Sequence, residues 1–130
     1  MRSAVTEILN LTINAFASDD RRSAEKVEPL EDLIDEIRIE LKTRHINRLR
    51  EGKCTVELGF IFSDFIGSLE KISDCCLNIA VSIIQLSDEN YDTHQYLSEE
   101  KESNEKYKER YNEYSKKYAL PFSKSGILSE

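Results

Sequence analysis

The stretch from residue 58 to residue 86, LGFIFSDFIGSLEKISDCCLNIAVSIIQL, decides the fold class of this chain. Its large apolar residues recur at alternating intervals of three and four positions, which places them along one side of an α-helix. The members of this apolar line are Leu58, Phe62, Phe65, Leu69, Ile72, Cys76, Ile79, Ile83 and Leu86. A second apolar flank consists of Ile66, Leu77, Ala80 and Ile84. An apolar face this wide predicts a helix that packs against two neighbours at the centre of a bundle.

The two segments before this stretch have the same helical period. Their apolar lines are Ala4, Ile8, Leu11 and Ala15 within residues 3–17, and Val27, Leu30, Ile34, Ile37 and Leu41 within residues 24–49. Pro29 is compatible with the second segment because it lies in the first turn or two of the helix. The connections on both sides are short, so we expect three antiparallel helices that share one core.

A polar loop is predicted over residues 87–95, and a fourth helix over residues 96–118. The apolar side of this helix is a stripe of tyrosines, Tyr107, Tyr111, Tyr114 and Tyr118. Tyrosine joins a large apolar ring to a polar hydroxyl, so the stripe should lie over the outside of the bundle or mediate self-association as a homodimer. The predicted fold is therefore all-α, an antiparallel three-helix bundle with an additional C-terminal helix. We expect one domain over residues 1–120 and a flexible tail over residues 121–130.

Composition and charge exclude several classes of partner. The formal net charge of −7 argues against nucleic acid, because affinity for a phosphate backbone comes mostly from Lys and Arg. No run approaches the ~20 apolar residues that a spanning helix needs, so this segment is not expected to insert into a membrane. The cysteines Cys54, Cys75 and Cys76 form neither an even disulfide framework nor a Cys-x-x-Cys motif, which favours a reducing, cytosolic compartment.

Two pairs of carboxylates have a spacing that suits a hard cation. Glu70 and Asp74 lie one helical turn apart, and Glu31 and Asp35 repeat this spacing on the preceding helix. No Lys or Arg follows Glu70 or Asp74 at the third or fourth position, so the repulsion within this pair has no relief along its own helix. A metal ion bound by all four carboxylates is one prediction, and solvated surface acids are the other.

The run from Glu70 to Ala80, EKISDCCLNIA, resembles the signature Glu-Arg-Ile-x-Asp-His-x-x-Asn-Ile of PhoU-like domains. Residues 24–35 are similar to the preceding helix of such a three-helix unit. Residues 48–54, 94–97 and 114–120 are similar to the corresponding parts of bacterial sodium/phosphate cotransporters, which carry a PhoU-like domain at their C-terminal end. Lys71 and Cys75 depart from the signature, since the usual residues there are arginine and histidine.

The resemblance implies a spectrin-like bundle without catalytic residues that regulates phosphate uptake. It further implies that Glu/Asp-x-x-x-Asp motifs hold iron, zinc or another di- or trivalent metal ion, here through Glu31, Asp35, Glu70 and Asp74. A stand-alone PhoU protein has two such units and this chain has one. The expected partner is therefore the membrane-spanning transporter part of the same polypeptide, with this domain on the cytoplasmic side of the inner membrane.

Two other functions are compatible with the sequence. Residues 30–50 look weakly like the first helix of a chorismate mutase, with Arg38, Arg44 and Arg48 as the cations that would hold a dianion. A generic helical interaction module without a metal would have the same apolar pattern. His45 and His94 have no ligand partner close in sequence, and a surface or capping role is expected for both.

Overall fold

The computed structural model describes residues 1–88 and 93–121, and within them the side chains of all but residues 88 and 93–103. The described residues form only helices: α1 (Arg2–Ser18), α2 (Arg21–Ala24), α3 (Val27–Arg50), α4 (Val56–Asp88) and α5 (Thr93–Lys117). The all-α prediction is confirmed. The helix predicted over residues 24–49 is divided, because a turn at residues 25 and 26 separates the short α2 from α3. No helix among the described residues is both long and apolar enough to cross a bilayer.

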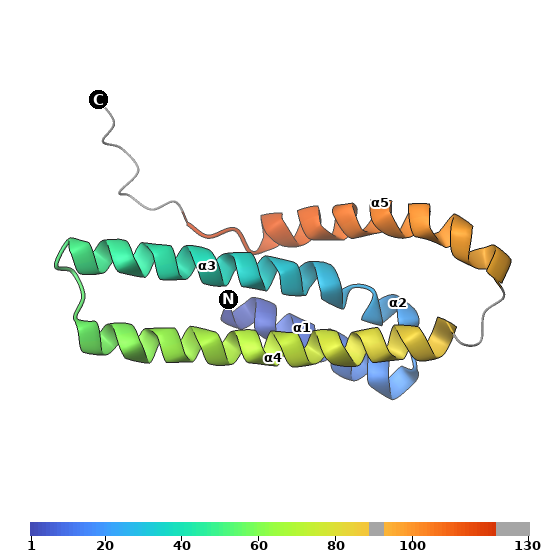
Figure 1. Cartoon of the computed structure of the whole chain (residues 1–130), viewed down its shortest axis with the longest axis horizontal. Coiled ribbons are helices and arrows are strands. Elements are labelled where there is room, and N and C mark those ends of the chain that lie inside the picture. The colour runs from blue at the N-terminus through green and yellow to red at the C-terminus, as the bar shows by residue number, and fades with distance from the viewer. Residues whose placement is uncertain (89–92, 122–130) are drawn as a thin grey trace, which may run out of the picture.

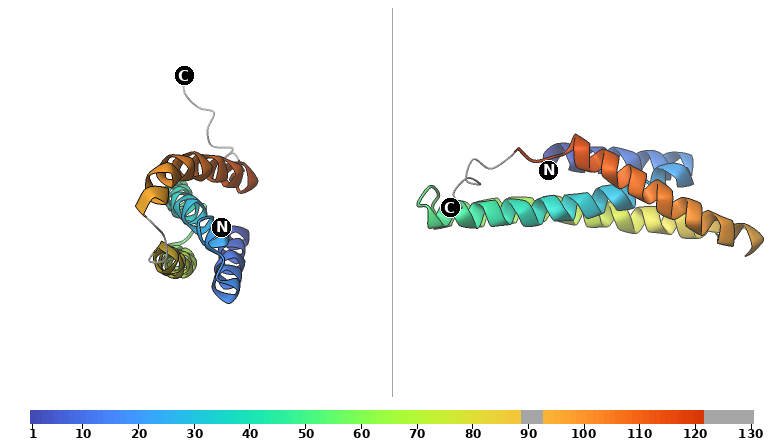
Figure 2. Two further views of the ribbon diagram at one scale, coloured as in Figure 1. Left: turned by 90° about the vertical axis from the view of Figure 1, so that its right-hand side faces the viewer. Right: turned by 90° about the horizontal axis from the view of Figure 1, so that it is seen from above.

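The helices α1, α3 and α4 form an up-down-up bundle, in which α3 runs opposite to the other two (Figure 1). The fourth long helix, α5, packs along α3 on the side away from α4 (Figure 2). Because α3 contacts all four other helices, α3 is the central helix and α4 is not. The prediction that residues 58–86 form a helix with two long neighbours is confirmed, since α4 packs against α1 and α3.

A residue with positive φ follows each of α1 and α3, in a polar stretch of the sequence. Asp19 is left-handed at the end of α1, and Asp20 caps α2 by accepting a hydrogen bond of 3.0 Å from the backbone N–H of Arg22. Gly52 has a φ of 66° after α3, where the Lys53 N–H donates to the Arg48 carbonyl at 2.8 Å. Glycine adopts this conformation without steric cost, so it reverses the chain tightly enough for α4 to pack along α3.

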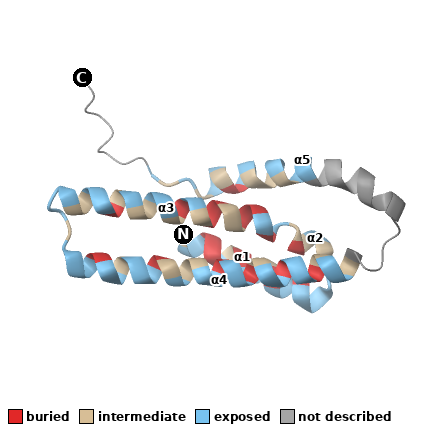
Figure 3. Cartoon of the chain, viewed as in Figure 1, coloured by how far each residue is buried: buried red, intermediate tan, exposed pale blue. Residues whose placement is uncertain are grey.

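The core lies between α1, α3 and α4, on the sides that face one another (Figure 3). The predicted apolar line of α3 is buried from Val27 to Ile37, and α1 buries Ala4, Ile8 and Ala15 as predicted. In α4 the prediction is confirmed only in part. Cys76 and Ile83 of the predicted line and Ile66 and Ala80 of the predicted flank are buried, whereas Phe65 and Ile79 of the line are 57 % and 43 % exposed. The residues that α4 buries are Gly59, Ile66, Ser73, Cys76, Ala80 and Ile83.

The face of α4 that packs inward is therefore rotated away from the predicted apolar line and toward small residues. Gly59, Ile66, Ser73 and Ala80 recur every seven positions, and three of these four side chains are small. Such side chains let α4 approach the bulky Leu30 and Ile34 of α3. The apolar residues of α4 cover more of its circumference than two neighbours can bury, so the largest ones are left at the surface.

Helices extend into the loop predicted over residues 87–95. The last two residues of α4 and the first three of α5 lie in that range, while residues 89–92 are outside the described residues. Of the tail predicted over residues 121–130, only Pro121 is described, and its carbonyl accepts a hydrogen bond of 2.6 Å from Arg44. The division at residue 120 stays a prediction.

Truncation of Ile34 in the core should destabilise the bundle much more than truncation of an exposed isoleucine on the same helix. Ile34 is fully buried, so Ile34→Ala should lower the free energy of unfolding by about 2 to 5 kcal/mol. Ile39→Ala is the matched control, because Ile39 is 54 % exposed, and its cost should be small. Urea unfolding followed by circular dichroism measures both, and equal costs would contradict this description of the core.

Candidate functional site

The two predicted carboxylate pairs lie on adjacent helices. Glu31 and Asp35 belong to α3, and Glu70 and Asp74 belong to α4. Because α3 and α4 are antiparallel neighbours, Glu31 comes next to Asp74, while Asp35 and Glu70 both contact the side chain of Arg38. All four acids predicted from the sequence are thus gathered in one place, which we call the carboxylate cluster.

Arg38 of α3 forms ion pairs with two of the four acids of this cluster. Its Nη2 lies 2.6 Å from Asp35 Oδ1, and its Nε lies 2.8 Å from Glu70 Oε1. Only 20 % of the Arg38 side chain and 25 % of the Glu70 side chain are exposed, so this pair across the two helices is partly shielded from water. The hydrogen bond and charge of Asp35, with the charge of Glu70, raise the pKa of the guanidinium. Arg38 is therefore a fixed cation that joins α3 to α4.

In the other half of the cluster the pKa of Glu31 is raised. Burial, the neighbouring charge of Asp32 and a hydrogen bond with Asp74 raise the pKa of Glu31 to about 7. A protonated carboxyl group can donate a hydrogen bond to a neighbouring carboxylate, which two carboxylates cannot do for each other. Near neutral pH the Glu31 and Asp74 pair therefore carries less than its formal charge.

Tyrosines of α5 contact the acids on the other side of α3. The hydroxyl of Tyr107 donates to Asp32, and that of Tyr111 donates to Glu36. Burial, followed by the hydrogen bond to the carboxylate, raises the pKa of each tyrosine. Neutral hydroxyls thus stabilise the outer acids of α3, and the predicted tyrosine stripe lies over the bundle.

The arrangement of the cluster differs from that of a carboxylate metal site. Such a site directs several unpaired oxygens at one point, where a hard cation replaces the missing positive charge. Here the guanidinium of Arg38 already contacts Asp35 and Glu70. In the part of the chain that the structure describes, no three His, Cys, Asp or Glu residues are placed to hold one metal ion. The four residues as arranged therefore do not fit a metal ion.

Arg38 belongs to this cluster although it was not predicted from the sequence. It comes from α3, whereas no Lys or Arg lies at the third or fourth position after Glu70 or Asp74 on their own helix. Its signal in the sequence was the interval of three residues after Asp35, which is a favourable spacing for an ion pair within a helix.

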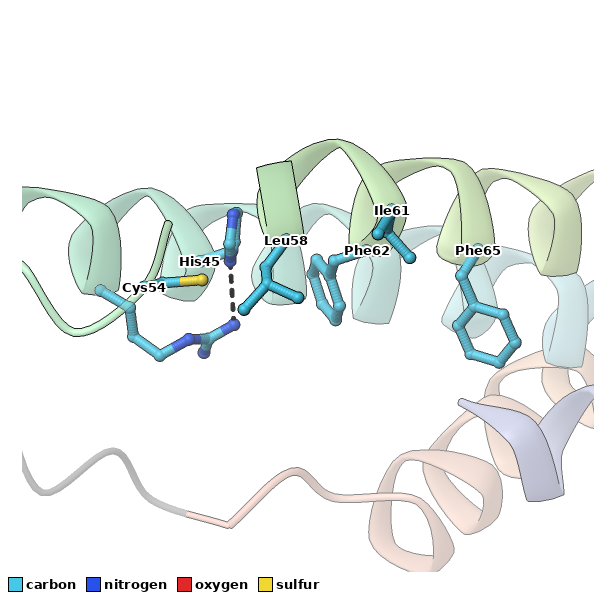
Figure 4. A pocket seen from close by; sticks show the side chains of 7 residues that line it. His45, Cys54, Leu58, Ile61, Phe62 and Phe65 are labelled. Carbon is cyan, nitrogen blue, oxygen red and sulfur yellow. Dashed lines mark hydrogen bonds between the residues drawn. The ribbon is translucent and has the colours of Figure 1, made fainter. Parts of the chain in front are cut away.

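A hollow separate from the carboxylate cluster lies near the turn between α3 and α4 (Figure 4). It has a volume of about 360 Å³ and is lined by His45, Arg48, Cys54, Leu58, Ile61, Phe62 and Phe65. Arg48 Nη2 lies 3.3 Å from His45 Nδ1, as the dashed line in Figure 4 marks. The expectation of a surface or capping role for His45 is wrong, because the residue is buried. Its Nε2 has no hydrogen-bond partner among the described residues and faces Gly59, where an added Cβ would lie only 2.6 Å away.

This histidine has a packing role. Its ring lies 5.1 Å from that of Phe62, and Gly59 leaves the space that the imidazole fills. The Nε2 that lacks a partner points at the α4 backbone, so it is not available to a ligand in the hollow. The side chain of His94 lies outside the described residues.

The comparison with known families finds a match over more than half of the chain. Residues 1–83 match the PhoU domain family, and this range includes α1, α2, α3 and most of α4 with all four carboxylates of the cluster. The helix α5 lies beyond the matched range. No curated protein and no solved structure matches the chain.

Removal of the Arg38 cation should destabilise the fold through the acids that it leaves unpaired. Arg38→Gln should lower the free energy of unfolding by about 1 to 3 kcal/mol, because Glu70 and Asp35 would keep their charge without a partner. The variant Arg38→Gln with Glu70→Gln should recover part of this loss in the same unfolding measurement. Arg22→Gln, at an exposed position, is the control. A double variant as unstable as the sum of its single changes would refute the pairing.

Proposed function

The chain belongs to the PhoU domain family, whose members regulate phosphate uptake, and we propose that it acts as the accessory domain of a sodium-dependent phosphate transporter. The observation that carries this proposal is the family match over residues 1–83, which covers the complete α1, α2 and α3 and most of α4. In this proposal the domain lies on the cytoplasmic side of the membrane, and its partner is the membrane-spanning part of the transporter.

Two features of the sequence support the transporter context. Residues 94–97 and 114–120 are similar to the ends of bacterial sodium/phosphate cotransporters, and both lie beyond the matched range. The chain also has one three-helix unit, where a stand-alone PhoU protein has two. Beyond the matched range, α5 covers the acidic side of α3 through Tyr107 and Tyr111.

The PhoU family is a regulatory, non-catalytic family. The contacts of the three arginines considered for a chorismate mutase agree with such a role. Arg38 pairs with Asp35 and Glu70, Arg44 with Glu40 and the Pro121 carbonyl, and Arg48 contacts His45. Each of these cations is engaged within the protein, and they lie along the length of α3. They do not converge on one site for a dianion.

Phosphate uptake in the source organism tests the proposed role. Deletion of residues 1–130 should leave sodium-dependent uptake of radiolabelled phosphate intact but remove its response to phosphate supply. Re-expression of the wild-type chain, with Arg22→Gln as a surface control, should restore the response. Uptake that responds to phosphate supply equally with and without the chain would contradict the proposal and favour a generic interaction module.

Metal binding is a second, separate proposal. We propose that a di- or trivalent ion such as iron or zinc binds Glu31, Asp35, Glu70 and Asp74 only after Arg38 has moved away. The support is the charge of the cluster, since Arg38 contacts Asp35 and Glu70 while Glu31 and Asp74 lie beside each other. The guanidinium and an ion would then compete for the same oxygens.

This competition predicts how melting temperature responds to added iron, zinc or manganese. A bound ion stabilises the folded state by mass action, so Arg38→Gln should show a larger metal-induced rise than wild type. Adding Glu70→Gln and Asp74→Asn to that variant should abolish the rise, because the ion loses two of its ligands. No rise in wild type or in Arg38→Gln would show that the cluster serves only to join α3 and α4.

A further inference from the structure

The outer face of α1 and α4 is apolar although it lies at the surface. Leu9, Ile13 and Phe16 of α1 are 36 %, 59 % and 74 % exposed. Phe65, Ile72 and Ile79 recur every seven residues along α4 and are exposed as well. The two helices are neighbours, and α5 lies on the other side of the bundle (Figure 2). We call these six residues the α1/α4 face.

This face carries both a groove and a protruding side chain. The groove lies between α1 and α4 and has a volume of about 330 Å³, with Leu9, Ile13, Ile72 and Ile79 among its walls. Phe16 lies one helical turn beyond Ile13 on α1 and is not part of the wall. A contact between two identical surfaces requires that each has both the inserted group and the site that receives it. The α1/α4 face meets this requirement.

The charge distribution also favours a second copy of the chain as the partner that binds this face. Two identical chains with a net charge of −7 repel each other, so they can approach only where that charge is absent. Residues 8–18 of α1 contain no charged residue, and neither do residues 75–87 of α4. Lys71 is the one charged residue in the wall of the groove. An acidic or basic partner would find no complementary charge on most of this face.

The exposed area is sufficient for a modest dimer. With about 200 Å² for a fully exposed large apolar residue, the six side chains present on the order of 600 Å² per chain. Specific interfaces begin at roughly this size, since their lower limit is about 1,200 Å² for both partners together. The area predicts an association that depends on concentration.

We propose that the chain forms a two-fold symmetric dimer through the α1/α4 face, in which Phe16 of each copy enters the groove between α1 and α4 of the other. The two-fold axis passes near Ile13, between the inserted ring and the groove. This interface is separate from the carboxylate cluster and does not depend on the role in phosphate uptake.

Sedimentation of the purified chain over a dilution series tests the dimer. The mass should approach twice 15.1 kDa as the concentration rises. Phe16→Ser should raise the dimer dissociation constant by about tenfold or more, because a buried aromatic side chain dominates such contacts. Ile13→Asp should do the same, because it places two like charges beside the axis. Both residues are exposed in the single chain, and a circular dichroism melt checks that the variants fold.

Phe60→Ser is the matched control. Phe60 is 70 % exposed on α4, close to the value for Phe16, but it does not belong to the α1/α4 face. This change should leave the dissociation constant within about twofold of wild type. A wild-type chain that stays at 15.1 kDa throughout the series would overturn the proposal. Equal weakening by Phe16→Ser and Phe60→Ser would overturn it as well, because the contact would then lie elsewhere.

Discussion

The packing of α4 on α3 depends on Arg38, because both helices carry acids into the region where they meet. Without a cation, Asp35 and Glu70 would repel across the interface, and the hydrophobic contacts beside them would form against that repulsion. A guanidinium suits the position better than an ammonium, since its planar fork donates to two carboxylates at once and keeps its proton at any accessible pH. In the remaining pair, the raised pKa of Glu31 lets this acid take up a proton near neutral pH beside Asp74. The cluster thus lowers its charge in two different ways within one helix interface.

The acids on the other side of α3 are stabilised without any cation. Tyr107 and Tyr111 of α5 donate hydrogen bonds to Asp32 and Glu36, so these acids keep their charge and gain neutral partners. At the far end of α5, Glu7 of α1 receives the Tyr118 hydroxyl and Lys117 Nζ. The helix α5 therefore attaches to the bundle through polar contacts at the tips of aromatic side chains, and their rings cover the apolar surface beneath. The family match ends before α5, so this acidic side of α3 receives its cover from outside the matched domain.

Periodicity predicted the number and order of the long helices but only part of the inward face of α4. Both faces of that helix repeat every seven residues, and the line through Phe65, Ile72 and Ile79 is the more hydrophobic of the two. Packing selected the line through Ile66, Ser73 and Ala80, because the opposing surface of α3 is already filled by large side chains. Hydrophobicity alone selects the wrong face, since which face packs inward depends on the shape of the neighbouring helix. The carboxylate cluster was likewise predicted only in part. The four carboxylates follow from spacing within each helix, whereas their counter-ion comes from the adjacent helix and depends on how α3 and α4 align.

The same physical reasoning explains why an acidic chain can present its most apolar surface to a copy of itself. Like charges repel over a distance that salt limits to about 8 Å at physiological ionic strength. At a rise of 1.5 Å per residue, the uncharged stretches of α1 and α4 extend about 16 Å and 20 Å along the bundle. A partner seated at the middle of either stretch therefore lies about one screening length from the acids at its ends, such as Glu7 and Asp19 on α1, so their repulsion is reduced there. The net charge then opposes association at other surfaces more than at this one, so charge restricts where two copies meet while the apolar side chains supply the attraction.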